Sequence, residues 1–187
     1  KLLNAPGESP IVDCIDASKF HRILIEHPSG PLNPMGWITI EGFEIRDCYH
    51  GIKFYNLHDS VIRRNWIHHN TLASGIYGNG TRILFDRNKI NSNGSSTTGN
   101  HGLYANGSHF TVTNNLFYDN QKYGIQLNGT FAYNPATSPG PEFVHSYNWT
   151  IANNTFAYQR QAPGMVVWGS TCNNARIENN IFYENGV

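Results

Sequence analysis

The hexapeptide Val112-Thr-Asn-Asn-Leu-Phe117 is one of six aligned copies of a unit, apolar-x-x-Asn-x-apolar, and five of the six carry the Asn. The other copies are Ile40-Glu-Gly-Phe-Glu-Ile45, Ile62-Arg-Arg-Asn-Trp-Ile67, Phe85-Asp-Arg-Asn-Lys-Ile90, Ile151-Ala-Asn-Asn-Thr-Phe156 and Ile177-Glu-Asn-Asn-Ile-Phe182. The first copy has Phe43 at the aligned site, and the other five have Asn65, Asn88, Asn115, Asn154 and Asn180. A second column lies five residues later, at Cys48, Asn70, Asn93, Asn120, Gln159 and Asn185. Such a repeat predicts stacked structural units.

The recurring asparagine has a physical role in a stack. A side-chain amide both donates and accepts, so an Asn at one turn can bond the same turn of the next rung, about 4.8 Å away. Enrichment of Asn in turns would not by itself predict a constant offset from apolar residues on both sides. The five aligned asparagines are therefore predicted to form a structural ladder.

The chain between the units predicts further strands. Five units continue with Gly and an apolar residue: Gly51-Ile52, Gly75-Ile76, Gly102-Leu103, Gly124-Ile125 and Gly164-Met165. We expect these glycines to adopt positive φ in a turn. Successive aligned sites are 22, 23, 27, 39 and 26 residues apart, which suits coils of three short strands with inserted loops at 94–100 and 131–147. Apolar residues alternate with period two and no amphipathic helix appears, so the chain is predicted to be a β-solenoid.

These repeats resemble the right-handed parallel β-helix repeat proteins, which include pectate lyases, alginate lyases, polygalacturonases and mannuronan epimerases. The likeness covers roughly Trp37 to Val187, and Asn4-Ala-Pro-Gly-Glu-Ser-Pro-Ile-Val-Asp13 is similar to the coil that precedes the repeats in many secreted members. The resemblance implies an all-β fold, a right-handed parallel β-helix of about 7–8 rungs. It also implies a single domain over residues 1–187, with leading coils in 1–36 and repeat coils in 37–187, or a piece of a longer solenoid.

Composition restricts the possible partners. The chain has 187 residues, 39% of them hydrophobic and 14% charged, with 13 basic and 13 acidic side chains. No strong electrostatic field is present to attract nucleic acid, and no apolar stretch is long enough to insert into a membrane. The low charge permits a solenoid to stack end to end on copies of itself. By resemblance, the protein is expected to be extracellular or at the cell surface.

Three cysteines, Cys14, Cys48 and Cys172, lack the spacing of a metal site. Buried structural thiols are the favoured interpretation, and one disulfide with a leftover thiol is the alternative. His68 and His69 are adjacent in a strand, so their side chains are expected to point to opposite sides rather than to bind a metal together. Glu41, Arg63 and Asp86 are expected to form a surface charge ladder that stabilises little.

In this family the substrate cleft runs along the strand that begins at the Gly-apolar pair. Alternation then places Ile52, Phe54, Ile76, Leu103, Ala105, Ile125, Leu127, Met165 and Val167 inside. The same alternation turns Lys53, Tyr55, Tyr77, Tyr104, Gln126, Val166 and Trp168 outward, with His50, His101 and Tyr123 just before them. Tyr55, Tyr77, Gln126, Trp168 and His50 are predicted to bind substrate, because aromatic faces stack on sugars and His can meet uronate carboxylates. The alternative is an aromatic ladder that stabilises the sheet face.

The resemblance implies lyase or epimerase chemistry, which removes the proton next to a uronate carboxyl group. His101, Tyr104 and Lys53 are the predicted catalytic residues, although a turn histidine beside a structural tyrosine would look the same. The outward stripe contains no Asp or Glu, which disfavours a hydrolase. No cofactor is predicted; calcium use stays open, although the acidic cluster that would bind the ion is not evident in the sequence. The predicted partner is an acidic polysaccharide, and the alternative is a non-enzymatic adhesive, carbohydrate-binding or self-stacking rod.

Overall fold

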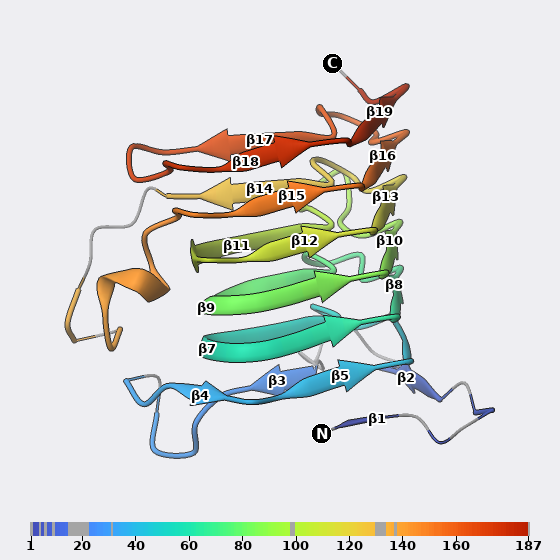
Figure 1. The fold of residues 1–187 in the computed structure, drawn as a ribbon. Coiled ribbons are helices and arrows are strands. Elements are labelled where there is room, and N and C mark those ends of the chain that lie inside the picture. The colour runs from blue at the N-terminus through green and yellow to red at the C-terminus, as the bar shows by residue number, and fades with distance from the viewer. Residues whose placement is uncertain are drawn as a thin grey trace.

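The computed structural model describes residues 2–3, 5, 7–8, 10–14, 23–30, 32–97, 100–129, 134–136 and 138–186. Its strands form coils that stack along one axis, and the two ends of the chain lie at opposite ends of the stack (Figure 1). Every strand pair in the two sheets is parallel. The chain is an all-β, right-handed parallel β-helix, as the resemblance implied.

One sheet has 12 strands and contains the first two strands of each coil. Its members are β1 (Leu2–Leu3), β3 (Ile23–Ile25), β4 (Met35–Gly36), β5 (Thr39–Glu41), β7 (Ile52–Arg63), β9 (Ile76–Asp86), β11 (Leu103–Ser108), β12 (Thr111–Thr113), β14 (Ile125–Asn128), β15 (Thr150–Ala152), β17 (Met165–Trp168) and β18 (Arg176–Glu178). β7 and β9 each span two of the expected short strands, bent where residues such as Asn56 and Asp59 have positive φ.

The second sheet has seven strands, one from the third side of each coil. These are β2 (Ile11–Asp13), β6 (Glu44–Arg46), β8 (Trp66–His68), β10 (Lys89–Asn91), β13 (Leu116–Tyr118), β16 (Thr155–Ala157) and β19 (Ile181–Tyr183). In this sheet Ile45, Ile67, Ile90, Phe117, Phe156 and Phe182 pair rung by rung. The repeat alignment therefore predicted the strand register correctly.

The core runs along the axis of the stack. Of the residues predicted to point inward, Ile52, Phe54, Ile76, Leu103, Ala105, Ile125 and Leu127 are fully buried. The rings of Phe117 and Phe156 lie 5.1 Å apart and nearly parallel. Val167 is 43% exposed, because β17 has a neighbouring strand only on the β14 side among the residues described.

The predicted asparagine ladder is present at the turn before the third strand. Each amide nitrogen donates to the side-chain oxygen of the next rung: Asn65 to Asn88 at 3.1 Å, and Asn88 to Asn115, Asn115 to Asn154 and Asn154 to Asn180 at 3.0 Å. The same amide nitrogens also donate to backbone carbonyl oxygens; that of Asn88, for example, donates to the carbonyl oxygen of Ile62. The second column repeats this pattern from Asn70 to Gln159. Both columns are buried except at the last coil, where Asn180 and Asn185 are half-buried, so most of the turns are held by buried, paired polar groups.

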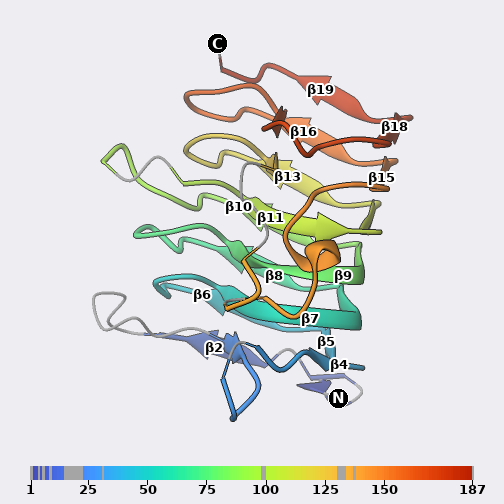
Figure 2. The ribbon, with the colours of Figure 1, turned by 90° about the vertical axis from the view of Figure 1, so that its left-hand side faces the viewer.

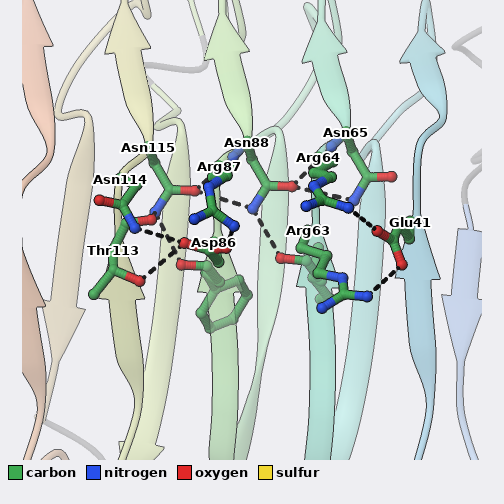
Figure 3. A network of polar contacts seen from close by, with 12 residues as sticks. Glu41, Arg63, Arg64, Asn65, Asp86, Arg87, Asn88, Thr113, Asn114 and Asn115 are labelled. Atoms are coloured by element: carbon green, nitrogen blue, oxygen red, sulfur yellow. Dashed lines mark hydrogen bonds and ion pairs between the residues drawn. The ribbon is translucent and has the colours of Figure 1, made fainter.

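A charged row lies beside this ladder on the outer surface (Figure 3). Arg63 and Arg64 donate to the two oxygens of Glu41 at 2.8 and 2.9 Å. Asp86 instead binds Arg87 of its own coil and the side chains of the next one, Thr113 and Asn114. The three residues of the expected ladder, Glu41, Arg63 and Asp86, are thus in register. Their hydrogen bonds and ion pairs also involve the neighbouring turn residues Arg64, Arg87 and Asn114.

A glycine is needed before the first strand of each coil because a side chain would not fit there, and not because of its backbone angles. Gly51, Gly75, Gly102, Gly124 and Gly164 are not among the residues with positive φ, so that expectation is wrong. A Cβ on Gly102 would lie 2.7 Å from the carbonyl oxygen of Gly124 and 3.1 Å from the Asn120 amide nitrogen. Because successive coils are only one strand spacing apart, no side chain fits there.

The left-handed residues instead form three columns, one at each turn of the coil. The first column is Trp37, Asp59, Arg82, His109, Asn148 and Asn174; the second is Gly42, Arg64, Arg87, Asn114, Asn153 and Asn179; the third is Asp47, His69, Ser92, Asp119, Tyr158 and Glu184. Asn is the common choice because it tolerates this conformation. Each column places one left-handed residue on each successive rung.

Cys14 and Cys48 form a disulfide between residues 34 positions apart, and Cys172 is free. The favoured interpretation of three thiols was wrong, and the alternative of one bridge with a leftover thiol is correct. The bridge joins the chain after β2 to the chain after β6, which are paired strands of neighbouring coils. Among the described residues, no helix is long and apolar enough to cross a bilayer.

Candidate functional site

A cleft lies over the starts of β7, β9 and β11, where the chain leaves each glycine turn. It has a volume of about 640 Å³ and is lined by Tyr49, His50, Lys53, Leu72, Ala73, Ser74, Tyr77, Asn100, His101 and Tyr104. A smaller hollow of about 200 Å³ continues it along the stack, lined by His101, Lys122, Tyr123, Gln126 and Trp168. His101 lines both hollows, and the two together are called the groove below.

The strand register brings the predicted residues together. Lys53, Tyr77, Tyr104 and Gln126 are consecutive partners across β7, β9, β11 and β14. Each lies between two buried residues, so the alternation of the strand turns its side chain outward. Of the eight predicted catalytic and binding residues, only Tyr55 lies outside the lining of the groove, and the ammonium of Lys53 lies 5.1 Å from its ring centre.

The aromatic rings of the groove stack on one another. Tyr77 and Tyr104 are parallel with centres 5.4 Å apart, and His101 is stacked between Tyr104 and Tyr123 at 5.4 and 5.2 Å. His50 continues the row at 5.0 Å from Tyr77. The faces of Tyr77 and Tyr104 are therefore covered, and the groove presents ring edges and hydroxyl groups. The aromatic ladder that was the alternative interpretation is present at the same place as the cleft.

His101 is the most perturbed ionisable group of the groove. It is 7% exposed, and its backbone N–H donates to the Ser74 hydroxyl at 3.3 Å. Burial, with the charge of Lys122 as a second cause, lowers the pKa of His101 to about 4. Its Nδ1 is buried without a hydrogen-bond partner among the residues that the structure describes. The imidazole is thus neutral near pH 7 and keeps capacity to accept or donate a proton.

Tyr104 is held by a residue that sequence reasoning missed. The amide nitrogen of Asn128 donates to the Tyr104 hydroxyl oxygen at 2.9 Å. Since this oxygen accepts from Asn128, the hydroxyl hydrogen is directed elsewhere. Burial raises the pKa of Tyr104, against the effect of the Asn128 bond. Tyr104 therefore stays protonated and can act as a proton donor. Asn128 follows Leu127 in the strand, but nothing in its spacing indicated this contact.

Positive charge flanks the aromatic row on both sides. The ammonium of Lys53 lies 5.2 Å from the ring centre of Tyr77. Lys122 lines the other end, where its charge acts on His101. The described lining of the two hollows includes no Asp or Glu. The groove therefore suits an anionic ligand, and two carboxylates for glycoside hydrolysis are lacking there.

The inserted loops differ in their relation to the groove. Asn100, at the end of the first insertion, lines the cleft and donates to the carbonyl oxygen of Leu72 at 3.2 Å. Residues 98–99 of that loop, and 131–133 and 137 of the second, lie outside the described part of the chain. The second insertion carries the short 3-10 helix η2 (Pro141–Phe143), which packs against β9 and β11 (Figure 2). Asn106, at the far end of β11, donates to Val144 of this loop.

The pair His68 and His69 does not lie as expected. Their Nδ1 atoms are 2.6 Å apart, because His69 has a left-handed backbone that turns its ring back toward His68. The Nε2 of His68 contacts Glu44 at 3.2 Å, and burial lowers the pKa of His68. No group of three or more metal-ligating side chains occurs among the residues described. We find no set of described side chains that would coordinate calcium or zinc.

The groove combines the groups that proton transfer requires. A neutral imidazole, a protonated phenol with an oriented hydroxyl and two ammonium groups lie within four rungs, with Lys53 on the first, His101 and Tyr104 on the third and Lys122 at the start of the fourth. A base, an acid and positive charge at one place permit proton abstraction beside a carboxylate.

Two solved structures share this fold. The structure titled "Crystal Structure of the periplasmic alginate epimerase AlgG" matches with a TM-score of 0.64 and 12% identity, over 86% of this chain and 35% of that one. The A-module of the mannuronan C-5 epimerase AlgE4 from Azotobacter vinelandii matches with a TM-score of 0.51 and 18% identity, over 78% of this chain and 41% of that one. At these identities the likeness concerns the fold alone.

This chain therefore spans less than half the length of either solved chain. No curated protein matches its sequence. The family model described as "Right handed beta helix region" matches residues 31–187, which include all six copies of the repeat unit. The chain belongs to the right-handed β-helix family.

Proposed function

We propose that this protein acts on a uronate-containing polysaccharide by lyase or epimerase chemistry. The observation that carries the proposal is the position of His101, neutral and central in a groove with two ammonium groups and no described carboxylate. The fold shared with two alginate epimerases is consistent with an acidic polysaccharide but does not by itself assign the activity.

The proposed reaction uses residues from the rungs of β7, β11 and β14. Lys122, whose charge acts on His101, holds the carboxylate of the reacting uronate and stabilises the charge that develops when the adjacent carbon loses its proton. Lys53, two rungs from His101, holds the carboxylate of a neighbouring sugar unit. His101 accepts that proton. Tyr104 then gives its hydroxyl proton either to the departing glycosidic oxygen, which completes an elimination, or to the opposite face of the same carbon, which completes an epimerisation.

The test separates these two outcomes. Wild type is incubated with pectate, alginate and glycosaminoglycans, with calcium and with a chelator. Ultraviolet absorbance reports unsaturated products, and proton NMR in deuterated water reports exchange at the carbon beside the carboxylate. His101→Gln should abolish product, while His145→Gln, a half-exposed histidine of the second insertion, should not. Unchanged activity in His101→Gln, or no product and no exchange from any substrate, would overturn the proposal.

We also propose that the lysines replace a metal at the carboxylate, so the activity should persist in chelator. The Cys14–Cys48 disulfide favours an oxidising compartment and thus an exported, extracellular or cell-surface protein. Loss of activity in chelator, with recovery on adding calcium, would instead assign the carboxylate to a bound ion.

A further inference from the structure

The first column of left-handed residues lies beside a second groove, separate from the site above. Trp37, Asp59, Arg82 and His109 occupy equivalent positions on four successive coils, with φ of 60°, 46°, 53° and 55°. The groove has a volume of about 420 Å³ and is lined by these four with Ser60, Val61, Ile83, Leu84 and Thr111. None of these residues lines the hollows around His101.

Trp37 is the unusual member of the column. A bulky side chain in a left-handed conformation is a conformational outlier, and the other members are polar residues. Trp37 is 77% exposed, so its indole gains little from burial, and its one described ring contact is an edge contact with His58 at 6.3 Å. A strained, exposed indole contributes little to folding and is better explained by a ligand.

The next two rungs supply a rigid polar pair. The guanidinium of Arg82 donates to both oxygens of Asp59, at 2.7 and 2.9 Å, in the bidentate geometry that fixes both side chains. Asp59 is held further by the Nδ1 of His58 at 2.9 Å. Both side chains are charged, and their opposite charges cancel. The pair can therefore form hydrogen bonds with a ligand without attracting an anion.

The floor of the groove is shallow and mostly apolar. Val61, Leu84 and Thr111 are register partners on β7, β9 and β12, and each is half-buried with its side chain outward. His109 stands at the far end, and its Nε2 accepts from the Asn148 amide at 3.0 Å, which leaves Nδ1 as the ring donor.

We propose that this groove binds an uncharged sugar unit of a glycan, with the ring stacked on the indole of Trp37 and hydroxyl groups bonded to the Asp59–Arg82 pair. A flat aromatic face, an apolar floor and a planar charge-neutral hydrogen-bonding pair together match the apolar face and hydroxyl rim of a pyranose. The catalytic groove, with its two lysines, would take the acidic units. This binding site does not depend on the proposed activity.

Calorimetry and tryptophan fluorescence with neutral tetrasaccharides of glucose, mannose and galactose test the site. We expect at least one of these tetrasaccharides to bind, and Trp37→Ala to weaken that binding about two- to tenfold, the value of an aromatic stacking contact. Arg82→Gln should weaken binding severalfold. Tyr158→Ala, a matched exposed aromatic residue with a left-handed backbone in the third column, should leave it unchanged.

Trp37 is exposed, so its replacement should leave the thermal unfolding curve in place, and circular dichroism verifies this. Three results would overturn the proposal: no binding of any neutral tetrasaccharide at millimolar concentration, equal binding by wild type and Trp37→Ala, or loss of binding in Tyr158→Ala. Because the probes carry no carboxylate, failure here is distinguishable from failure of the uronate chemistry.

Discussion

The asparagine columns and the aromatic groove are built by the same rule, one side chain per rung, yet they differ in how their polar groups are paired. In the columns each buried amide bonds its neighbours on both sides, as Asn115 does with Asn88 and Asn154. In the groove His101 is as well buried but has a Nδ1 without a described partner. A paired buried polar group serves stability, and an unpaired one is a candidate for function.

Breaking a paired column should have the largest effect. Asn115→Ala removes an amide that accepts from the backbone and side chain of Asn88 and donates to Asn154 and the Phe85 carbonyl. Leaving such buried groups unpaired should lower the free energy of unfolding by about 3–5 kcal/mol. Urea unfolding followed by circular dichroism measures this.

Asn114→Gly is the matched control, because Asn114 is exposed and glycine keeps its left-handed backbone. It should cost less than about 1 kcal/mol, the value of one ordinary hydrogen bond. Equal losses in both variants would show that the ladder is not the stabilising element.

Titrating the groove should have the next largest effect. The unfolded chain binds a proton at the ordinary histidine pKa of 6.5, while the folded chain holds His101 at about 4. Stability should therefore fall as the pH drops from 6.5 toward 4, by about 3 kcal/mol from this residue. His101→Phe, which keeps the stacked ring, should show a smaller loss across this window than wild type. Parallel unfolding curves for the two proteins would contradict the buried neutral imidazole.

A smaller change should come from Lys122. Burial is the main cause of the lowered pKa of His101 and the Lys122 charge is the second. Lys122→Met should therefore raise the pKa of His101 while leaving it below the ordinary value, which an NMR titration of the imidazole measures. A return to the ordinary value would mean that charge, and not burial, controls the groove.

The smallest effect is expected at the exposed charged row. Arg63→Gln removes one of two arginines that bond Glu41, and Arg64 remains at 2.9 Å. Exposed ion pairs of this kind contribute little to stability, and salt screens them. Thermal unfolding at low and high salt should show a small difference that vanishes in salt. If Arg63→Gln destabilised the protein as much as Asn115→Ala, the contacts of Glu41 would be essential for stability.

Much of the groove could be predicted because alternation and register are properties of the repeat. Lys53, Tyr77, Tyr104 and Gln126 could be placed on one face from their offset to the glycine alone. The contact between Asn128 and Tyr104 could not, because it joins different rungs through side-chain rotamers.

Sequence alone was sufficient for the coil, the ladder, the inward and outward residues and the alignment of strands, because period-two alternation and a repeated amide are local patterns that stacking copies rung by rung. Tertiary structure was needed for the turns. The crowding at Gly102, the bridge from Cys14 to Cys48, the convergence of His68 on His69 and the groove beside Trp37 all depend on how close neighbouring coils approach and on left-handed backbone angles. Those distances arise only when the coils are assembled, so no single repeat contains them.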